Sequence, residues 1–284
     1  MQLDTYTTAT DWLAEAGEHL YRHEEANSLV LGIAERVARA SEPVEPQPYF
    51  AAVSEGARLV AAALMTPPHN VVFSMDSAAD PGALGLVARD LLEHSRPVPG
   101  VLAPPAVAAA FASLWCAATG ECSNVRRRER AHALRRVVQP RYSPGGLRPA
   151  AEGDRALLLE WWRGFAIDAL EEDDPQAVLD LTERTLRGGD AFLWVDGTPV
   201  SLAARGRPTR RGITITGVYT PPEHRRRGYA GSAVARLSAQ LLAEGRAFVA
   251  INTDLANPTA NHIYYEVGYR PVGDMDELHF KPRA

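Results

Sequence analysis

The sequence has only two cysteines and one lysine, and each scarcity excludes a class of protein. Cys116 and Cys122 are too few for a disulfide framework or a four-ligand zinc site, which favours a reduced, cytoplasmic setting. Because Lys281 is the only lysine, nearly all of the 30 basic residues are arginines. They are outnumbered by 35 acidic residues, for a formal net charge of -5, so the strongly basic balance of a nucleic-acid-binding protein is missing.

Long hydrophobic runs are also missing. The longest, from Ala106 to Ala118, falls short of the roughly 20 residues that span a bilayer and predicts a buried helix. The first residues, Met1 to Asp4, carry an acid and no basic stretch before an apolar one, so no secretory signal is predicted. We therefore expect no membrane partner. The 46% hydrophobic and 23% charged residues are typical of a globular chain with a core.

The length of 284 residues is about twice that of a typical domain, which favours two domains. Residues 139–146, a stretch of turn formers after an arginine-rich segment, are the best candidate for a linker. They divide the chain into predicted domains at residues 1–140 and 147–284. Both halves show the same predicted order of helices and strands, which indicates an internal duplication.

Hydrophobic periodicity and turn residues predict the elements of each half. The first half is expected to have strands at 49–53, 59–64, 71–74 and 100–103 and helices at 85–94 and 106–118. Residues 126–130 and 135–136, rich in arginine, are expected to decorate the edge strands that close this half. The second half is expected to have helices at 154–169, 176–187, 231–244 and 258–267, strands at 213–219, 247–253 and after 269, and a hairpin of strands 191–195 and 199–204.

The segment from Thr216 to Gly231, TGVYTPPEHRRRGYAG, ends a predicted strand with two prolines and leads through arginines and a glycine into a helix. Backbone N–H groups at a helix N-terminus lack intrahelical acceptors, and together with the helix dipole they can hold a pyrophosphate. Gly228 allows the close approach that a Cβ would block. A solvated loop could have the same composition, so the segment alone leaves both interpretations open. It matches neither P-loop nor Rossmann spacing.

A later segment, NTDLANPTANHIYYEVGY from Asn252 to Tyr269, completes a pattern that resembles the GNAT superfamily of acetyl-CoA-dependent N-acetyltransferases. The family's phosphate loop, (R/Q)-x-x-G-x-(G/A) behind a strand ending V-x-x-P, is matched by Arg225, Gly228, Ala230, Val218 and Pro221. The family's second motif, N-x-x-(A/S)-N-x-x-Y-x-x-x-G-(Y/F), is matched by Asn257, Ala260, Asn261, Tyr264, Gly268 and Tyr269. The resemblance covers residues 147–284, and the first half shares only the order of elements.

The resemblance implies an α/β (α+β) fold of two tandem GNAT-like domains, each a mixed, mostly antiparallel sheet flanked by helices. In the second domain the sheet would split between its fourth and fifth strands, with acetyl-CoA as cosubstrate in the split and no metal. Backbone groups at Val218 and Thr220 would bond the pantetheine arm, with Asn257 on its other side. The residues implied to bind the cofactor are Val218, Thr220, Arg225, Arg226, Arg227, Gly228, Tyr229, Ala230, Gly231, Asn257 and Asn261.

The implied reaction is a direct transfer in which a neutral primary amine attacks the acetyl carbonyl, so no nucleophilic serine or cysteine is needed. Tyr264 would act as general acid and protonate the leaving thiolate. The general base stays open, because the strand at 213–219 offers Thr214 and Thr216 where many relatives place a glutamate. A water-mediated base and a partly deprotonated substrate are alternatives, and the nearest carboxylates in sequence are Glu223, Asp254 and Glu266.

The expected acceptor is an amine of a small molecule or of a protein. Acidic residues at 171–174 could attract a cationic amine, or could simply form a solvated loop. Residues 75–85 contain no matching phosphate loop, so the first domain is expected to be degenerate and to stand in for a partner subunit in a monomeric protein. Two alternatives stay open: a regulatory module that binds acetyl-CoA or CoA without transferring anything, and a tandem acetyltransferase specific for an aminosugar-type metabolite.

Overall fold

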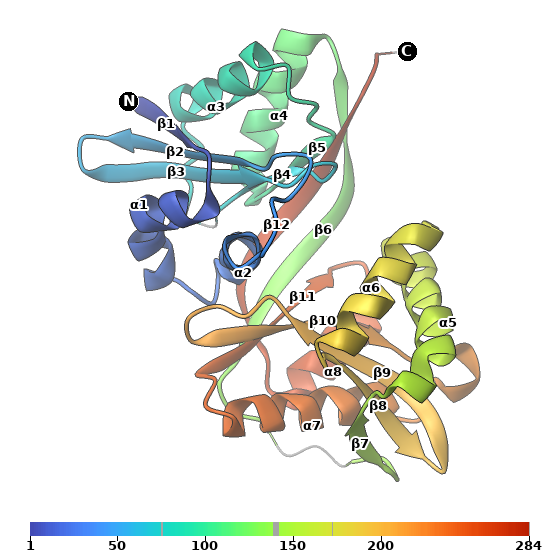
Figure 1. The fold of residues 1–284 in the computed structure, drawn as a ribbon. Coiled ribbons are helices and arrows are strands. Elements are labelled where there is room, and N and C mark those ends of the chain that lie inside the picture. The colour runs from blue at the N-terminus through green and yellow to red at the C-terminus, as the bar shows by residue number, and fades with distance from the viewer. Residues whose placement is uncertain (75, 139–141, 172, 284) are drawn as a thin grey trace.

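The computed structural model describes residues 1–74, 76–138, 142–171 and 173–283, and every strand within them belongs to one mixed sheet (Figure 1). The strands are β1 (Gln2–Tyr6), β2 (Tyr49–Glu55), β3 (Arg58–Met65), β4 (Val71–Phe73), β5 (Gly100–Ala103), β6 (Cys122–Leu134), β7 (Gly146–Pro149), β8 (Ala191–Asp196), β9 (Thr198–Gly206), β10 (Gly212–Tyr219), β11 (Phe248–Asp254) and β12 (Arg270–Lys281). The helices are α1 (Ala9–Arg22), α2 (Ser28–Ala38), α3 (Pro81–Glu93), α4 (Pro105–Thr119), α5 (Arg155–Phe165), α6 (Pro175–Arg187), α7 (Tyr229–Ala243) and α8 (Pro258–Val267). A turn of π-helix, Ala166–Leu170, extends α5.

The order of strands in the sheet is β1-β2-β3-β4-β5-β12-β6-β11-β10-β9-β8-β7. The parallel pairs are β4 with β5 and β10 with β11, at equivalent places in the two halves, and the other pairs are antiparallel. Each half also has two helices before its main strands, a helix between its parallel strands and another after them. The predicted fold class, two tandem GNAT-like units with mixed, mostly antiparallel sheets, is confirmed, and so is the duplication of elements.

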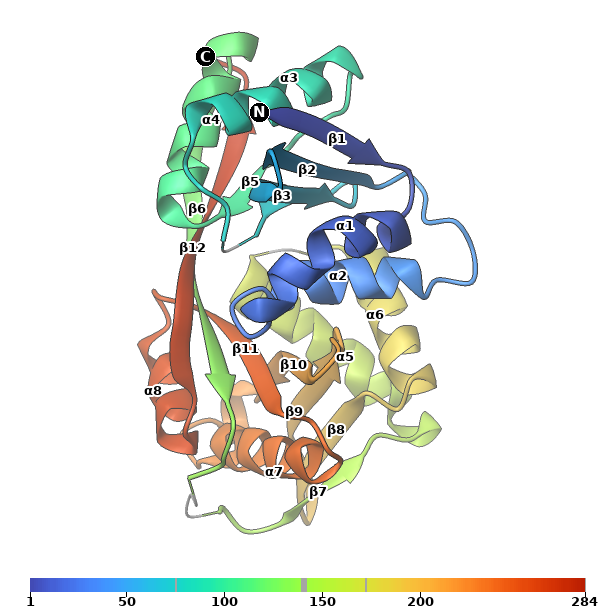
Figure 2. The same ribbon diagram turned by 90° about the vertical axis from the view of Figure 1, so that its left-hand side faces the viewer.

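The two halves exchange strands where they meet. β6 and β12 pair with each other along nearly their whole length, from Cys122 opposite Lys281 to Ala133 opposite Arg270. On its other side β12, the last strand of the second half, pairs with β5 of the first half, whereas β6 pairs with β11 of the second half. Figures 1 and 2 show these two long strands running through both halves. Each half therefore completes its sheet with a strand from the other.

Alternation of side chains along β6 and β12 assigns the helices to the two faces of the sheet. Leu278 and Phe280 pack into the core under α3 and α4, whereas Met275 packs under α1 and α2. Leu134 packs under α7 and α8, while Trp162 of α5 belongs to the core on the other face of that half. The pairs α1/α2 and α5/α6 thus share one face of the sheet.

Signals that are readable in the sequence fix several element ends. Asp80 and Asp174 cap α3 and α6 by accepting hydrogen bonds from backbone N–H groups, and a proline follows each at the first helical position. The predicted Asp-Gly hairpin joins β8 and β9, with Gly197 at φ +70°. The helix predicted at 231–244 begins two residues earlier, because the glycine that precedes it, Gly228, serves as its N-cap.

Further contacts fasten the halves to each other. Glu24, at the connection between α1 and α2, is only 4% exposed and accepts hydrogen bonds from Thr209 Oγ1 at 2.7 Å and the Arg211 N–H at 2.8 Å. Gly32 of α2 lies so close to Arg207 that a Cβ would approach the Arg207 Cβ within 2.6 Å. Because Arg207, Thr209 and Arg211 all belong to the β9–β10 connection, this connection docks on α1 and α2 of the first half.

The sequence pattern misses β1 and β7 and misplaces β6. The expectation that arginines at 126–130 decorate an edge strand is wrong, because β6 lies inside the sheet between β12 and β11. Neighbouring carboxylates make these charges tolerable there: Arg130 pairs with Asp274 at 2.6 Å, and Arg128 lies 4.0 Å from Asp276. Residues 139–141 of the predicted linker lie outside the described residues, and its end enters β7. The domain boundary stays a prediction.

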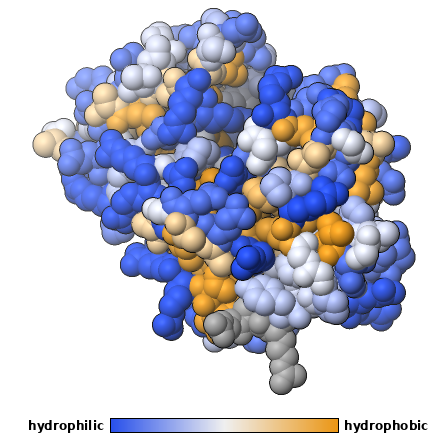
Figure 3. Space-filling view, turned by 60° about the horizontal axis from the view of Figure 1, so that its bottom comes forward, coloured by the Kyte–Doolittle hydropathy of each residue, from blue (hydrophilic) through white to orange (hydrophobic). Residues whose placement is uncertain are grey.

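The surface mixes hydrophobic and hydrophilic residues. On the face shown in Figure 3, hydrophobic residues reach the surface in separate groups between hydrophilic ones. Large exposed hydrophobic side chains such as Leu92, Leu179 and Tyr265 lie on different helices, as is ordinary for a protein surface. Of the helices in the described ranges, none has the length and apolar character needed to cross a membrane.

Candidate functional site

The parallel strands β10 and β11 separate toward their C-terminal ends. They pair from Gly212 with Phe248 to Ile215 with Ile251, and beyond that point each continues without pairing to the other. A β-bulge between Ile215 and Gly217 interrupts the ladder of β10 with β9 at the same place. The predicted split between the fourth and fifth strands of the second half is confirmed. It leaves the edge of β10 around Val218 free of a strand partner on the β11 side.

The predicted phosphate loop turns the chain from the end of β10 into α7. Arg226 and Gly228 both have left-handed backbones, with φ of 62° and 79°. A Cβ at Gly228 would lie 2.8 Å from Ser143 Oγ, so conformation and space both favour glycine. No side chain within the described ranges caps the N-terminus of α7, so the N–H groups of residues 229–231 point out of the helix without an intrahelical acceptor. Such an arrangement suits an anion.

The loop contains three consecutive arginines, residues 225–227, and contacts to other residues hold Arg225 in place. Residues 225–227 are all exposed. The Arg225 Nε donates to the carbonyl of Thr220 at 2.9 Å, and its Nη2 lies 2.5 Å from the Asp168 carboxylate in the π-helical turn. Arg225 therefore ties the loop to the end of β10 and to the π-helical turn after α5, and it occupies the carbonyl of Thr220, a residue whose backbone is predicted to bond the pantetheine arm.

Three hydrogen bonds, made by Ser143 and Tyr229, support the loop. Ser143 donates from its hydroxyl to the Arg227 carbonyl and from its N–H to Ser232 Oγ, both at 2.8 Å. The Tyr229 hydroxyl donates to the Asp196 carboxylate at 2.6 Å, and the residue is 6% exposed. Tyr229 can therefore serve the predicted phosphate site only through its backbone N–H.

The second motif lies on α8, at the end of β11. Asn257 caps α8 by accepting from the Ala260 N–H at 3.0 Å. Asn261 accepts from Thr253 Oγ1 at 2.6 Å and donates to the carbonyls of Asp254 and Asn257, each at 2.8 Å. Asn261 thus holds α8 against β11, where the two strands separate, while Asn257 caps the helix. The cofactor contacts predicted for them stay predictions.

Tyr264 and its neighbour Tyr265 lie in opposite environments. Tyr264 is 8% exposed and packs with Ile251 in the core under α7 and α8, its ring centroid 6.0 Å from that of Tyr269. Burial raises the pKa of the Tyr264 hydroxyl, which keeps it protonated and able to donate at neutral pH. Tyr265 is 56% exposed, with the Arg270 guanidinium 4.2 Å from its ring centroid. Of the neighbours Tyr264 and Tyr265, only Tyr264 is buried, as the predicted acid should be.

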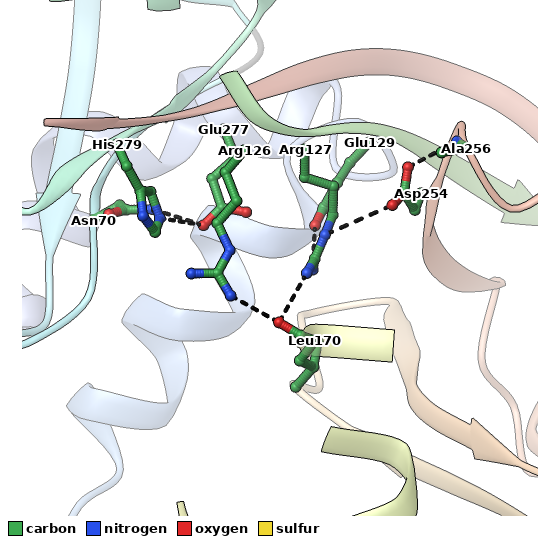
Figure 4. A network of polar contacts seen from close by, with 9 residues as sticks. All are labelled: Asn70, Arg126, Arg127, Glu129, Leu170, Asp254, Ala256, Glu277 and His279. Atoms are coloured by element: carbon green, nitrogen blue, oxygen red, sulfur yellow. Dashed lines mark hydrogen bonds and ion pairs between the residues drawn. The ribbon is translucent and has the colours of Figure 1, made fainter. Parts of the chain in front are cut away.

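A cluster of charged residues lies across β11 from the split, and sequence reasoning misses it (Figure 4). In the ladder between β11 and β6, Asp254 stands directly opposite Glu129. Arg127 lies 3.6 Å from Glu129 and 3.8 Å from Asp254. A register shift on β6 lets Arg126 and Arg127, although consecutive, both donate to the Leu170 carbonyl, at 2.7 and 3.3 Å. The signal in the sequence is the acidic residue within an arginine run, RRRER.

The carboxylates considered from the sequence lie in different settings. Glu223 and Glu266 are exposed, on the turn before the loop and on α8. Asp254 accepts from the Ala256 N–H at 2.8 Å, which closes the turn after β11. Thr214 on β10 is 2% exposed, and its hydroxyl has no hydrogen-bond partner among the residues described. Within those residues, no group of three or more His, Cys, Asp or Glu side chains is placed to hold a metal ion.

The equivalent place in the first half is built differently. Its central helix, α3, has an Asp80 side chain at its N-terminus, which accepts from the N–H groups of Gly82 at 2.8 Å and Ala83 at 3.1 Å. A carboxylate therefore already occupies the position where α7 leaves its N–H groups uncapped. Met75, in the same connection, lies outside the described residues.

Comparisons with known proteins agree with this geometry. Residues 195–276 match the model of the FR47-like protein family. A GNAT acetyltransferase from Colwellia psychrerythraea is similar, with 12% identity, a TM-score of 0.58 and coverage of 99% of this chain and 100% of that one. A GCN5-related N-acetyltransferase from Sphaerobacter thermophilus is similar with 17% identity and a TM-score of 0.62, over 98% of this chain and 95% of that one. A tandem GNAT protein from the clavulanic acid biosynthesis pathway is similar with 12% identity and a TM-score of 0.55, over 99% of this chain and 98% of that one.

No curated protein matches the chain. At identities this low, similarity to solved structures establishes the fold and not the reaction. The chain has the tandem GNAT fold, and the resemblance of its second half to the GNAT superfamily is confirmed. The roles of individual site residues remain predictions.

Proposed function

We propose that the second half of the chain is an N-acetyltransferase that moves an acetyl group from acetyl-CoA to a primary amine. The observation that carries this proposal is the uncapped N-terminus of α7 beside the split between β10 and β11. An anion site next to a free strand edge suits a cosubstrate with a pyrophosphate at one end and an amide-containing arm leading to a thioester. The tandem GNAT fold supports the same assignment.

In this proposal, the loop, the edge of β10 and Tyr264 have separate roles. N–H groups at 229–231, with Arg226 and Arg227 beside them, bind the pyrophosphate, and the edge of β10 at Val218 pairs with the pantetheine arm. The thioester then lies in the split, where the amine attacks its carbonyl carbon directly. Tyr264, buried and protonated, gives a proton to the departing thiolate.

The first half has a supporting role in this proposal. Its α3 N-terminus carries the Asp80 carboxylate, which would repel a phosphate. It contributes β6 beside β11 and docks α1 and α2 on the β9–β10 connection, so it takes the place that a partner subunit would otherwise fill.

The test is to incubate the purified chain with acetyl-CoA and an amine, and to follow release of free thiol. Spermidine, glucosamine and a peptide with a free N-terminus represent a polyamine, an amino sugar and a protein terminus. Amine-dependent thiol release, with the acetylated amine identified by mass, is the expected result.

One observation favours a second candidate, a regulatory module that binds acetyl-CoA or CoA without transferring anything. β10 offers no carboxylate where it approaches the split, and its polar side chains are the hydroxyls of Thr214, Thr216 and Tyr219. Thermal stabilisation by CoA without thiol release for any amine would select the module over the enzyme.

A further inference from the structure

We infer that Glu129, on a strand that the first half contributes, takes the proton from the acceptor amine in the site of the second half. This inference rests on the proposed function, and it deepens that function by naming the missing base. It arises from the strand exchange, because β6 precedes the predicted linker in sequence but lies beside β11 in the sheet.

The register of the strands places Glu129 next to the split. Pairing between β10 and β11 ends at Ile251, and the rest of β11 has β6 as its sheet neighbour, with Asp254 opposite Glu129. Neighbouring strands lie about 4.8 Å apart, so the Glu129 backbone is one strand spacing from the part of β11 that borders the split. A side chain of this length, or one water beyond it, can reach an amine that enters there.

Glu129 and Tyr264 lie on opposite faces of the sheet. Glu129 lies opposite Met275 in the ladder with β12, and Met275 packs under α1 and α2. Tyr264 packs on the other face, under α7 and α8. A thioester in the split would thus have its predicted acid on one side and Glu129 on the other. This separation suits direct transfer, because one group takes a proton from the attacking amine and the other gives a proton to the departing thiolate.

Glu129 is both shielded and reachable. Its side chain keeps 18% of its surface exposed, so it is not closed off from solvent. The charged groups that face it are Arg127 on its own strand, Glu277 on β12, Asp254 on β11 and Arg207 after β9. Burial raises the pKa of the Glu129 carboxyl, Glu277 adds to the rise, and Arg127 and Arg207 oppose it. A raised pKa makes the carboxylate a better proton acceptor near neutral pH.

The other carboxylates of the cluster have other partners. Asp254 closes the turn after β11 through the Ala256 N–H. Glu277 accepts from the Asn70 side-chain amide at 3.0 Å and pairs with His279 Nε2 at 3.0 Å, farther into the first half (Figure 4). Arg127 pairs with both Asp254 and Glu129 and so holds the two carboxylates in position. With this pair formed, the Glu129 side chain is still partly exposed.

The proton transfers balance in the following way. The acceptor enters as an ammonium ion and gives one proton to the Glu129 carboxylate, directly or through one water. The neutral nitrogen attacks the acetyl carbon, so that a C–N bond forms and the C–S bond breaks. The nitrogen loses its second proton, which replaces the proton that Tyr264 gives to the thiolate. Glu129 then releases its proton to water, and the products are the amide, the thiol and one proton.

The first experiment measures kcat/KM against pH for wild type and Glu129→Gln, using whichever probe amine (spermidine, glucosamine or peptide) the wild type acetylates best. We expect Glu129→Gln to lower kcat/KM about 100-fold at neutral pH, within the range for loss of a positioned base. The deficit should shrink as the pH approaches the pKa of the amine itself, because free amine then needs no base. An unchanged profile in Glu129→Gln would overturn the inference.

Two further variants separate chemistry from structure. Glu277→Gln removes a negative charge that raises the Glu129 pKa, so the acidic limb of the wild-type profile should move to lower pH. Asp276→Asn is the matched control, because Asp276 lies in the neighbouring row of the β6–β12 ladder with its side chain on the opposite face. It should leave the limb where it is, and an equal shift in both variants would contradict the inference.

A measurement that does not depend on turnover follows the Glu129 carboxyl by carbon-13 NMR in the CoA-bound chain labelled at glutamate, with Glu129→Gln identifying the signal. Titration above the ordinary glutamate range, about 4.3, is expected. Titration at or below that range, in a chain that still acetylates the probe, would overturn the inference alone. A wild type that binds CoA but acetylates none of the probes would overturn the proposed function and the inference with it.

Discussion

At Gly228, the backbone conformation and the proposed anion site both depend on the absence of a side chain. Its φ of 79° belongs to a region that L-residues rarely adopt, and its missing Cβ leaves room for Ser143 on one side and open N–H groups on the other. A side chain here would therefore disturb the loop and its anion site together.

Gly228→Val should abolish binding of CoA. In wild type, CoA at 100 times its dissociation constant should stabilise the fold by about 2.7 kcal/mol, which thermal unfolding detects as a higher Tm. The variant should show no such rise. Gly245→Val is the control, because Gly245 also has positive φ, +97°, but follows the far end of α7, where no neighbouring atom of the described residues lies within 4 Å of the added Cβ. Wild-type stabilisation by CoA in Gly228→Val would refute the phosphate-loop assignment.

Tyr264→Phe should separate rate from binding. A positioned acid contributes about 10²- to 10⁴-fold, so kcat should fall by that factor, while CoA affinity should hardly change because the ring still packs. Steady-state kinetics and calorimetry measure the two quantities. Tyr265→Phe, on the exposed side of α8, should be silent. Full activity in Tyr264→Phe, or damage confined to Tyr265→Phe, would show that the acid is misassigned even though the fold is right.

Helices α3 and α7 occupy equivalent places in the two halves, but their N-termini are capped differently. Asp80 satisfies the first N–H groups of α3 with a carboxylate, whereas the N-cap of α7 is Gly228 and no side chain among the described residues caps this helix. The N-terminus of α3 is thus occupied by a carboxylate of the protein, whereas the N-terminus of α7 is open to an anionic ligand.

Calorimetric titration should therefore give one CoA site per chain. Removing the internal anion should not create a second site, because the α3 connection lacks the arginines that precede Gly228. We expect Asp80→Asn, which can still cap, to leave the stoichiometry at one. Two sites in wild type would refute the view that the first half is degenerate.

Local signals explain which elements the sequence predicts well. The helices from Pro105 to Thr119 and from Pro258 to Val267 follow from apolar spacing, prolines and terminal glycines, and the β8–β9 hairpin follows from its Asp-Gly turn. β6 could not be placed in the same way. Arginines at 126–130 resemble an exposed edge, and the carboxylates that pair with them, such as Asp274, come from a strand more than a hundred residues later. The Glu129 cluster is hidden for the same reason.

The strand exchange decides how the halves depend on each other at the scale of the whole molecule. A boundary near residue 140 is natural in sequence, because turn formers concentrate there. The ladder nevertheless crosses it, since β6 lies between β11 and β12 of the later half and β12 lies beside β5 of the earlier one. Sequence periodicity cannot reveal such an exchange, because it specifies which residues form strands and not which strands pair.

The chain split into residues 1–138 and 142–284 should test this dependence. Without β6, fragment 142–284 would expose the edge of β11 and lose Leu134, which is fully buried in its core, while β12 would lose both neighbours. Such unpaired edges promote aggregation, so we expect this fragment alone to be insoluble or unfolded. Co-expression of both fragments should instead give a soluble one-to-one complex that binds CoA. Size-exclusion chromatography with light scattering and thermal unfolding with CoA measure the outcome. If 142–284 alone were a monomer that unfolds cooperatively and binds CoA, the first half would be dispensable for the fold, and the exchanged strand would not explain why the two halves form one chain.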